Sequence, residues 1–244
     1  DSMGRWQVDT IPADSPSVYV TVTHPDFMPT SMKLEVSRFQ LVGTAAPSEV
    51  IQLSRGLTLS GLVSDADGDP IPGAIVRTQL RNETLEATTD AQGEYHLPRC
   101  AEGSTAVAVT ASGFGPEVKD INIQAGMVPV DFVLPVGKTI RVRVTDTDGK
   151  PIKRTRMFFQ RWRNRINFAY QMGMMFEYTD ENGVWEWNSA PQDALVFDVC
   201  PPGSMQIVDQ SLAARDDEYH FVATPQLTIK GIVLDAETHQ PINS

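Results

Sequence analysis

The chain has 244 residues, a formal net charge of −11 and 41% apolar residues, which is enough apolar content for ordinary globular cores. No stretch approaches the roughly 18–20 continuous apolar residues of a membrane span. The acidic balance argues against general nucleic-acid binding, which needs a basic face. It suits an exported or surface protein, and it suits many cytosolic proteins equally well.

Alternation of apolar and polar residues at period two, the pattern of a half-buried strand, recurs along the whole chain. It is found at residues 18–23, 59–63, 106–110, 140–144 and 229–233. Glycines and prolines, 17 of each, punctuate these segments. Helical periodicity is weak, and only residues 208–218 are a candidate for either one short helix or an irregular loop. The pattern predicts an all-β fold.

Two short motifs recur and interleave. The first, here called the Pro-Ile motif, runs from an Asp through a turn to Pro-Ile, and its Asp stands at 65, 146 and 235. The second, the Gly-aromatic motif, reads Asp-x-x-Gly-x-aromatic and begins at 1, 90 and 180. The two lie 25 residues apart in one copy (65 to 90) and 34 in the next (146 to 180), so the later copy carries an insertion of about nine residues. Internal repetition of this kind predicts several copies of one β module.

A period of 80–90 residues is too long for a solenoid turn and suits a small sandwich with its own core. The motif positions predict two whole copies at 55–136 and 137–225. Residues 1–54 would be the C-terminal part of a truncated copy, and 226–244 the start of a further one. Because the sequence opens at Asp1 and stops within a motif, we expect it to be a fragment of a longer protein.

The order of the motifs resembles a known family. Four elements of the copy at 55–136 carry the resemblance: Gly61-Leu62-Val63, Pro70-Ile71-Pro72-Gly73-Ala74-Ile75-Val76, Thr89-Asp90-Ala91-Gln92-Gly93-Glu94-Tyr95 and Gly113-Phe114-Gly115-Pro116. They are similar to the carboxypeptidase regulatory-like domain, a transthyretin-like (prealbumin-type) β-sandwich. The copy at 137–225 keeps the start and Thr179 to Trp185 but lacks the Gly-Ala and Gly-Phe pairs.

This resemblance implies tandem seven-strand, Ig-like β-sandwiches that serve as repeated accessory modules in large exported or surface proteins. The family supplies no catalytic residues of its own. A zinc carboxypeptidase needs a His-x-x-Glu pair and a later His, and none of His24, His96, His220 and His239 is followed by Glu three residues on. No nucleophile elbow, phosphate-binding loop or Cys-x-x-Cys is present. We therefore expect neither an enzyme nor a cofactor.

Cys100 and Cys200 fall at different points of successive copies, so free, partly buried thiols are expected rather than a disulfide. Trp6, Tyr95 and Trp185 occupy the same point of the Gly-aromatic motif, which predicts a sandwich-core position.

A calcium loop is a weak candidate at Asp65, Asp67 and Asp69, because alternate acids around Gly68 resemble the start of such a loop. Position twelve of that loop is Val76, which cannot ligate, and the next copy replaces Asp69 with Lys150. A hairpin turn explains the same residues without a metal.

A local reversal of charge in the insertion is the best candidate for a binding site. Arg161, Arg163 and Arg165 alternate with Trp162, which on a strand places three guanidiniums on one face. Guanidiniums bind carboxylates and sulfates bidentately, and aromatic rings stack on sugars or cations. Together with Tyr170, these residues predict a face for an anionic glycan or a protein. The alternative is that the arginines pair with acids of a neighbouring module.

These patterns predict a non-catalytic structural, spacer or interaction module of a larger secreted or cell-surface protein. The alternative is a carbohydrate-binding module that uses residues 154–170. The expected partners are neighbouring repeats of the same protein, with a polysaccharide or another surface protein as further candidates. Nucleic acid is not an expected partner, and no membrane span is expected.

Overall fold

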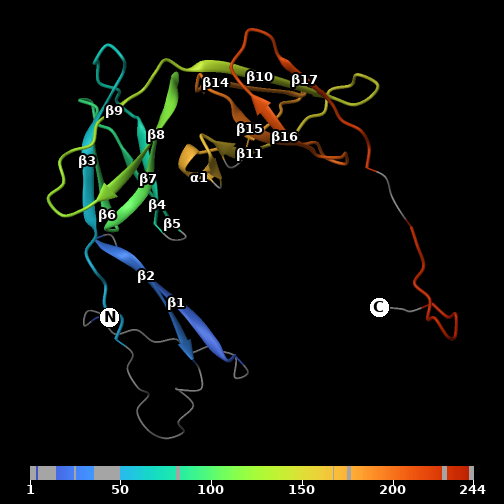
Figure 1. Ribbon diagram of the computed structural model, residues 1–244, viewed down its shortest axis with the longest axis horizontal. Coiled ribbons are helices and arrows are strands. Elements are labelled where there is room, and N and C mark those ends of the chain that lie inside the picture. Colours follow the sequence, from blue (N-terminus) through green and yellow to red (C-terminus); the bar gives the residue numbers. More distant parts are fainter. Residues whose placement is uncertain are drawn as a thin grey trace, which may run out of the picture. The chain divides into compact units, whose positions relative to one another are not determined.

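The computed structural model describes residue 4 and residues 15–24, 26–35, 50–80, 83–166, 168–174, 177–226 and 230–241. Within this part of the chain there are 17 strands and one helix of four residues (Figure 1). None of its helices is long and apolar enough to cross a membrane. The predicted all-β fold class is therefore confirmed.

The chain forms two compact units. Unit 1 contains residues 1–109 and 118–133, and unit 2 contains residues 110–117 and 134–244. The segment 110–117, at the turn between two strands of the copy predicted at 55–136, thus belongs to unit 2. The domain boundaries predicted from the motifs remain a prediction.

Unit 1 begins with an antiparallel hairpin of β1 (Ser17–His24) and β2 (Phe27–Glu35). A three-stranded sheet follows, in which β3 (Leu57–Ser64) pairs antiparallel with β6 (Glu94–Cys100) and parallel with β9 (Phe132–Val133). The remaining strands form a four-stranded sheet in the order β5 (Glu83–Thr88), β4 (Ile75–Leu80), β7 (Gly103–Ala111), β8 (Phe114–Ile123).

Unit 2 has a first sheet with the same pairing pattern. Its strand β10 (Lys138–Thr145) pairs antiparallel with β14 (Val184–Ala190) and parallel with β17 (Tyr219–Val222). The second sheet has the order β12 (Arg165–Ile166), β11 (Arg156–Trp162), β15 (Leu195–Cys200), β16 (Ile207–Leu212), and β13 (Glu177–Tyr178) also pairs with β11. In Figure 1 the two sheets of unit 2 form two layers.

The segment 208–218 is not helical. Most of its first half belongs to β16, and the rest is a loop before β17. The helix among the described residues, α1 (Ala169–Met172), lies in the insertion between β12 and β13. Two of its apolar residues, Ala169 and Met172, are buried. With four residues, the helix is too short to show a helical period in the sequence.

The alternation at 59–63 and 140–144 is confirmed as half-buried strand in β3 and β10. The strand predicted at 229–233 is not found in its described part, because residues 230–233 are exposed and lie outside the strands. Leu59 and Val63 of β3, and Ile140, Val142 and Val144 of β10, are completely buried. Tyr95 and Trp185 are buried core residues, as their shared motif position predicted. Trp6, the third residue of that set, lies outside the described residues.

Each of the five motifs that lie within the described residues folds into a turn organised by its Asp. The Oδ1 atom of Asp65 accepts hydrogen bonds from the backbone N–H groups of Asp67 (3.0 Å) and Asp69 (2.9 Å). Asp90, Asp146 and Asp180 accept bonds from the residues two and four positions later in the same way. Asp235 accepts bonds from Glu237 and Thr238. These side chains act as local caps for tight turns.

The two turns of one copy are joined to each other, an arrangement here called the turn lock. Val63 donates its N–H to Gly93 O (2.8 Å) and accepts from Ile71 N (2.9 Å). Val144 makes the same two bonds, with Gly183 O (2.8 Å) and Ile152 N (2.9 Å). The end of the first strand is therefore held between the two turns in both units.

A buried threonine completes each turn lock. Thr89 Oγ1 donates to Ile71 O (2.7 Å) and accepts from Ala74 N (2.8 Å). Thr179 Oγ1 repeats this with Ile152 O (2.9 Å) and Thr155 N (2.9 Å). Because both threonines are buried, these backbone groups have no water to replace the hydroxyl.

The turn lock predicts a specific cost for adding a methyl group at Gly93. Its φ is +74°, and a Cβ there would lie 2.5 Å from Val63 O. Gly68 has a φ of +89° but open space around the same position. Gly68→Ala should therefore cost only the ~1–2 kcal/mol of a left-handed backbone, whereas Gly93→Ala should cost a further ~1–3 kcal/mol from overpacking. Urea unfolding of both variants measures the difference, and equal destabilisation would contradict the close approach.

Candidate functional site

The arginine-rich stretch is a hairpin rather than one continuous strand. Strand β11 ends at Trp162 and β12 begins at Arg165, with Trp162 opposite Arg165 in the register. The two residues between them, Arg163 and Asn164, have φ values of +47° and +62°. Positive φ at both central residues is the geometry of a tight hairpin turn. The predicted strand with three guanidiniums on one face is therefore wrong, because the chain reverses direction in its middle.

Trp162 is a core residue. Its side chain is 1% exposed, and its indole Nε1 donates to Asp193 Oδ2 at 2.8 Å. The guanidinium of Arg163 lies over the ring, 4.3 Å from its centroid. The ring is thus occupied from within the protein, and the prediction that it stacks on a sugar is not compatible with its burial.

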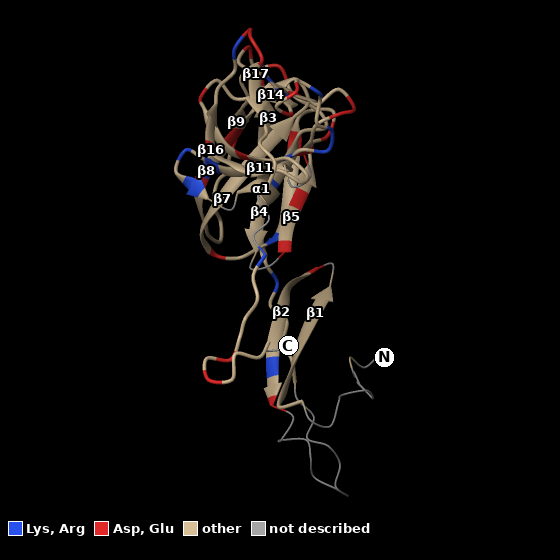
Figure 2. Cartoon of the chain, turned by 90° about the vertical axis from the view of Figure 1, so that its right-hand side faces the viewer, with Lys and Arg blue, Asp and Glu red and all other residues tan. Residues whose placement is uncertain are grey.

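Arg161 and Arg163 pair with acids. Arg161 contacts Asp209 at 2.9 Å. Arg163 contacts Asp193 at 2.9 Å and Glu117, in the segment 110–117 of unit 2, at 2.8 Å. Glu117 belongs to the copy predicted at 55–136, so this pair is of the kind that the alternative prediction described. Along the ribbon, Lys and Arg positions alternate with Asp and Glu positions in the view of Figure 2.

The two remaining candidate residues, Arg165 and Tyr170, have different surroundings. The guanidinium of Arg165 lies 5.9 Å from the centroid of the Phe168 ring, at the start of the insertion. Tyr170, in α1, is 58% exposed. Of the five predicted residues, Tyr170 and the half-exposed Arg161 are those whose side chains face solvent most clearly.

Asp193 organises this hairpin and carries no sequence signal. Its carboxylate accepts from both Trp162 and Arg163. Burial raises the pKa of Asp193, but the hydrogen bonds and charge of Arg163 outweigh burial, so its pKa lies below the ordinary value of 3.8. The pKa of Arg163 is raised in turn, chiefly by its hydrogen bond to Asp193.

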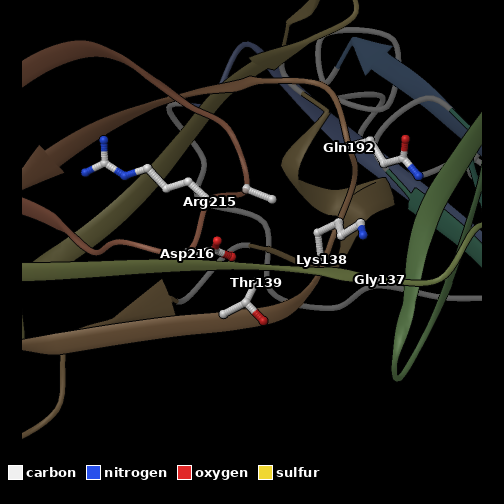
Figure 3. Close-up of a pocket in the computed structure, with 7 residues that line it drawn as sticks. Gly137, Lys138, Thr139, Gln192, Arg215 and Asp216 are labelled. Carbon is white, nitrogen blue, oxygen red and sulfur yellow. The ribbon is translucent and has the colours of Figure 1, made fainter.

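A polar pocket of about 510 Å³ lies elsewhere in unit 2, at the start of β10 (Figure 3). Its lining residues are Gly137, Lys138, Thr139, Gln192, Ala214, Arg215 and Asp216. The Arg215 guanidinium donates to the carbonyls of Asp217 (3.0 Å) and Glu218 (2.7 Å) and stacks on Tyr219. Arg215 therefore stabilises the loop before β17. The side chains of Lys138, Gln192 and Asp216 are a cation, an amide and an acid, and together they do not favour one class of ligand.

A second pocket, of about 360 Å³, lies in unit 1 along β3 and β6. Tyr95 lines it and donates its hydroxyl to Val130 O at 2.7 Å, and burial raises the pKa of that hydroxyl. Asp131 accepts from Leu62 N at 2.9 Å. These polar groups hold the segment before β9 across the sheet.

Asp65, Asp67 and Asp69 show no cation-binding arrangement. Within the described ranges, no group of three or more His, Cys, Asp or Glu side chains is placed to hold a metal ion. The Oδ1 atom of Asp65 is directed at its own turn, which is the hairpin explanation of the motif.

The prediction of free thiols is confirmed for Cys100, which is buried, and for Cys200, which is half-buried. Burial raises the pKa of both thiols.

The low pKa of Asp193 predicts a pH-dependent contribution to stability. A carboxylate whose pKa is lower in the folded state stabilises that state above the unfolded pKa and loses its contribution as pH falls through the folded value. Asp193→Asn should therefore lower the free energy of unfolding of unit 2 by about 1 kcal/mol at pH 7. The difference from wild type should shrink as the pH falls below about 3.8, the ordinary Asp value. Urea unfolding between pH 3 and 7 measures it, and a difference independent of pH would contradict the pairing.

Comparison with known proteins gives a family for part of the chain. No curated protein matches the sequence. Among solved structures, a Streptococcal ancillary pilin has 14% identity, with 85% of this chain and 74% of that one covered, at a TM-score of 0.33. The Bacillus anthracis TIE protein has 12% identity over 88% and 44%, at 0.31. The minor pilin GBS52 of Streptococcus agalactiae has 13% identity over 71% and 98%, at 0.31. The family model that matches is that of the carboxypeptidase regulatory-like domain, and it covers residues 58–135.

Proposed function

We propose that the chain is a non-catalytic spacer or display segment of a larger secreted or cell-surface protein, built from tandem transthyretin-like modules. One observation carries the proposal. The residues that recur between the predicted copies are the ones that make the turn lock, including Asp65 and Asp146, Thr89 and Thr179, and Gly93 and Gly183. What the repeat preserves is therefore structural chemistry.

The pairing of the strands supports the same proposal. The first strand of each predicted copy, β3 or β10, is central in its sheet. It is antiparallel to the strand of the Gly-aromatic motif and parallel to the last strand of that copy. The last strand of each predicted copy thus lies in the same sheet as its first strand. This arrangement allows copies to follow one another along the chain. The match of residues 58–135 to the carboxypeptidase regulatory-like domain supports the same use, because the resemblance implies repeated accessory modules.

The carbohydrate-binding alternative at residues 154–170 has less support. Trp162 is buried, and Arg161 and Arg163 have carboxylate partners. The exposed ring of Tyr170 is the feature that still favours it. Tyr170→Ala tested on an array of anionic glycans would decide, since loss of a wild-type signal would favour this alternative and absence of any signal would remove it.

Stretching single molecules tests the spacer proposal. Serial modules should give two separate unfolding events, each releasing roughly 80–90 residues and therefore about 27–31 nm of chain. Gly93→Ala should lower the force of one event and leave the other at its wild-type value, because the strain is confined to one turn lock. One joint event, or extension without resistance, would contradict the proposal.

Location is tested on cells that produce the protein. Antibodies against the folded chain should bind intact cells or the culture medium, and added protease should remove the signal from intact cells. A signal found only after lysis would contradict secretion or surface display.

A further inference from the structure

The same pair of backbone hydrogen bonds occurs at two corresponding places and holds the linker that leaves each predicted copy. At the first place, Gly115 N donates to Pro135 O (2.8 Å) and Gly137 N donates to Gly113 O (2.8 Å). Between them, Phe114 and Val136 form an isolated antiparallel bridge. This arrangement, residues 113–115 with 135–137, is here called the first bracket.

The second bracket joins residues 203–205 to 224–226. Met205 N donates to Thr224 O (2.9 Å), Gln226 N donates to Gly203 O (3.4 Å), and Ser204 and Pro225 form the bridge. The side chain of Gln226 adds a bond from Nε2 to Ser204 O (3.0 Å). The two brackets share the same pattern of donors and acceptors. The glycine with positive φ is common to both, as Gly113 and Gly203, while the other residues differ.

The first bracket also receives groups from the copy that follows it. Ser189, in β14, accepts a hydrogen bond from Gly113 N at 2.9 Å. A Cβ on Gly137 would lie 2.7 Å from Asn188 O and 2.9 Å from Gly113 O, so the backbone at 188 and at 113 approaches this glycine closely. Arg163 pairs with Glu117, two residues beyond the bracket. These contacts explain why residues 110–117 belong to unit 2.

We propose that the turn in each bracket is an interaction surface for the next copy of the module, so that the turn folds together with the copy after it. Gly113–Gly115 serves the copy beginning at 137, and Gly203–Met205 serves the one beginning at 226. The bracket fixes the register in which the linker enters the following copy. This proposal rests on one part of the proposed function, namely that copies of the module follow one another along the chain.

Apolar exposure beside the second bracket agrees with this assignment. Met205 is 55% exposed and Val208 is 54% exposed. Met205 occupies the place of Gly115, which lies close to Ala190 and Pro191 in the first bracket. The occupant that fits is therefore the corresponding strand end of the following copy.

Hydrogen exchange of individual amides in the full chain tests the coupling. Gly183→Ala strains the turn lock of unit 2, because a Cβ would lie 2.5 Å from Val144 O. It should raise exchange of the amides of Gly113 and Gly115 at least tenfold and leave those of β3 and β6 unchanged. Gly93→Ala, the matched variant in unit 1, should do the reverse. Asp193→Asn is a milder substitution in unit 2 should Gly183→Ala fail to fold. The proposal would be overturned if Gly93→Ala, and not Gly183→Ala, raised the exchange of the amides of Gly113 and Gly115.

The second bracket is tested with a pair of substitutions at one position. Gln226→Pro removes the donating N–H, whereas Gln226→Ala keeps it and loses only the side-chain bond. Exchange of the Met205 amide should rise at least tenfold in the proline variant and less than threefold in the alanine variant, with the buried β15 amides unchanged in both. Equal exchange in wild type and the proline variant would overturn the proposal. Two unfolding events under force do not require the brackets, so failure here leaves the spacer function standing.

Discussion

The constraint on which the rest of the structure depends is the turn lock at the end of each first strand. Val63 and Val144 each bond to both turns of their copy, and a buried threonine ties the same turns to the next strand. Backbone groups buried in this way must find partners inside the protein. The lock supplies them, and it sets where the second sheet begins relative to the first. Asp, Thr and Gly are required at fixed spacing because each provides a different part: an acceptor for turn amides, a buried hydroxyl, and room for a carbonyl.

This constraint separates the preserved from the variable parts of the chain. The motif residues are engaged in turns, so they have little left to offer a ligand. In the predicted copy at 137–225, β12 and β13 pair with β11 as β5 pairs with β4, and α1 lies between them. Trp162 and its neighbouring arginines stabilise the hairpin of β11 and β12 through Asp193 and Asp209. The cluster of arginines and Trp162, which the sequence suggests as a binding site, thus mainly makes contacts within unit 2.

Prediction from sequence succeeded where the pattern is local and repeated. The alternation at Ile140, Val142 and Val144 placed the core face, and the aligned motifs identified the Asp segments as turns. It failed at residues 161–166, because a two-residue turn without glycine interrupts an alternation that looks continuous. It also failed at 208–218, where six residues of β16 lack strict alternation, and at α1, which is too short to show a helical period. Asp193 could not be found, since it lies about thirty residues from its partners.

The sequence by itself determined that the fold is all-β, that residues 58–135 resemble the carboxypeptidase regulatory-like domain, and which side of β3 and of β10 is buried. These properties follow from short-range periodicity and from motifs that each fold into one turn. The tertiary structure alone decided that Trp162 is core, that its neighbouring arginines have acidic partners, and that the turns at 113–115 and 203–205 hold the outgoing linkers. The reason is physical: these features depend on contacts between segments distant in the chain, and backbone hydrogen bonds such as those of the brackets leave no trace in side-chain identity.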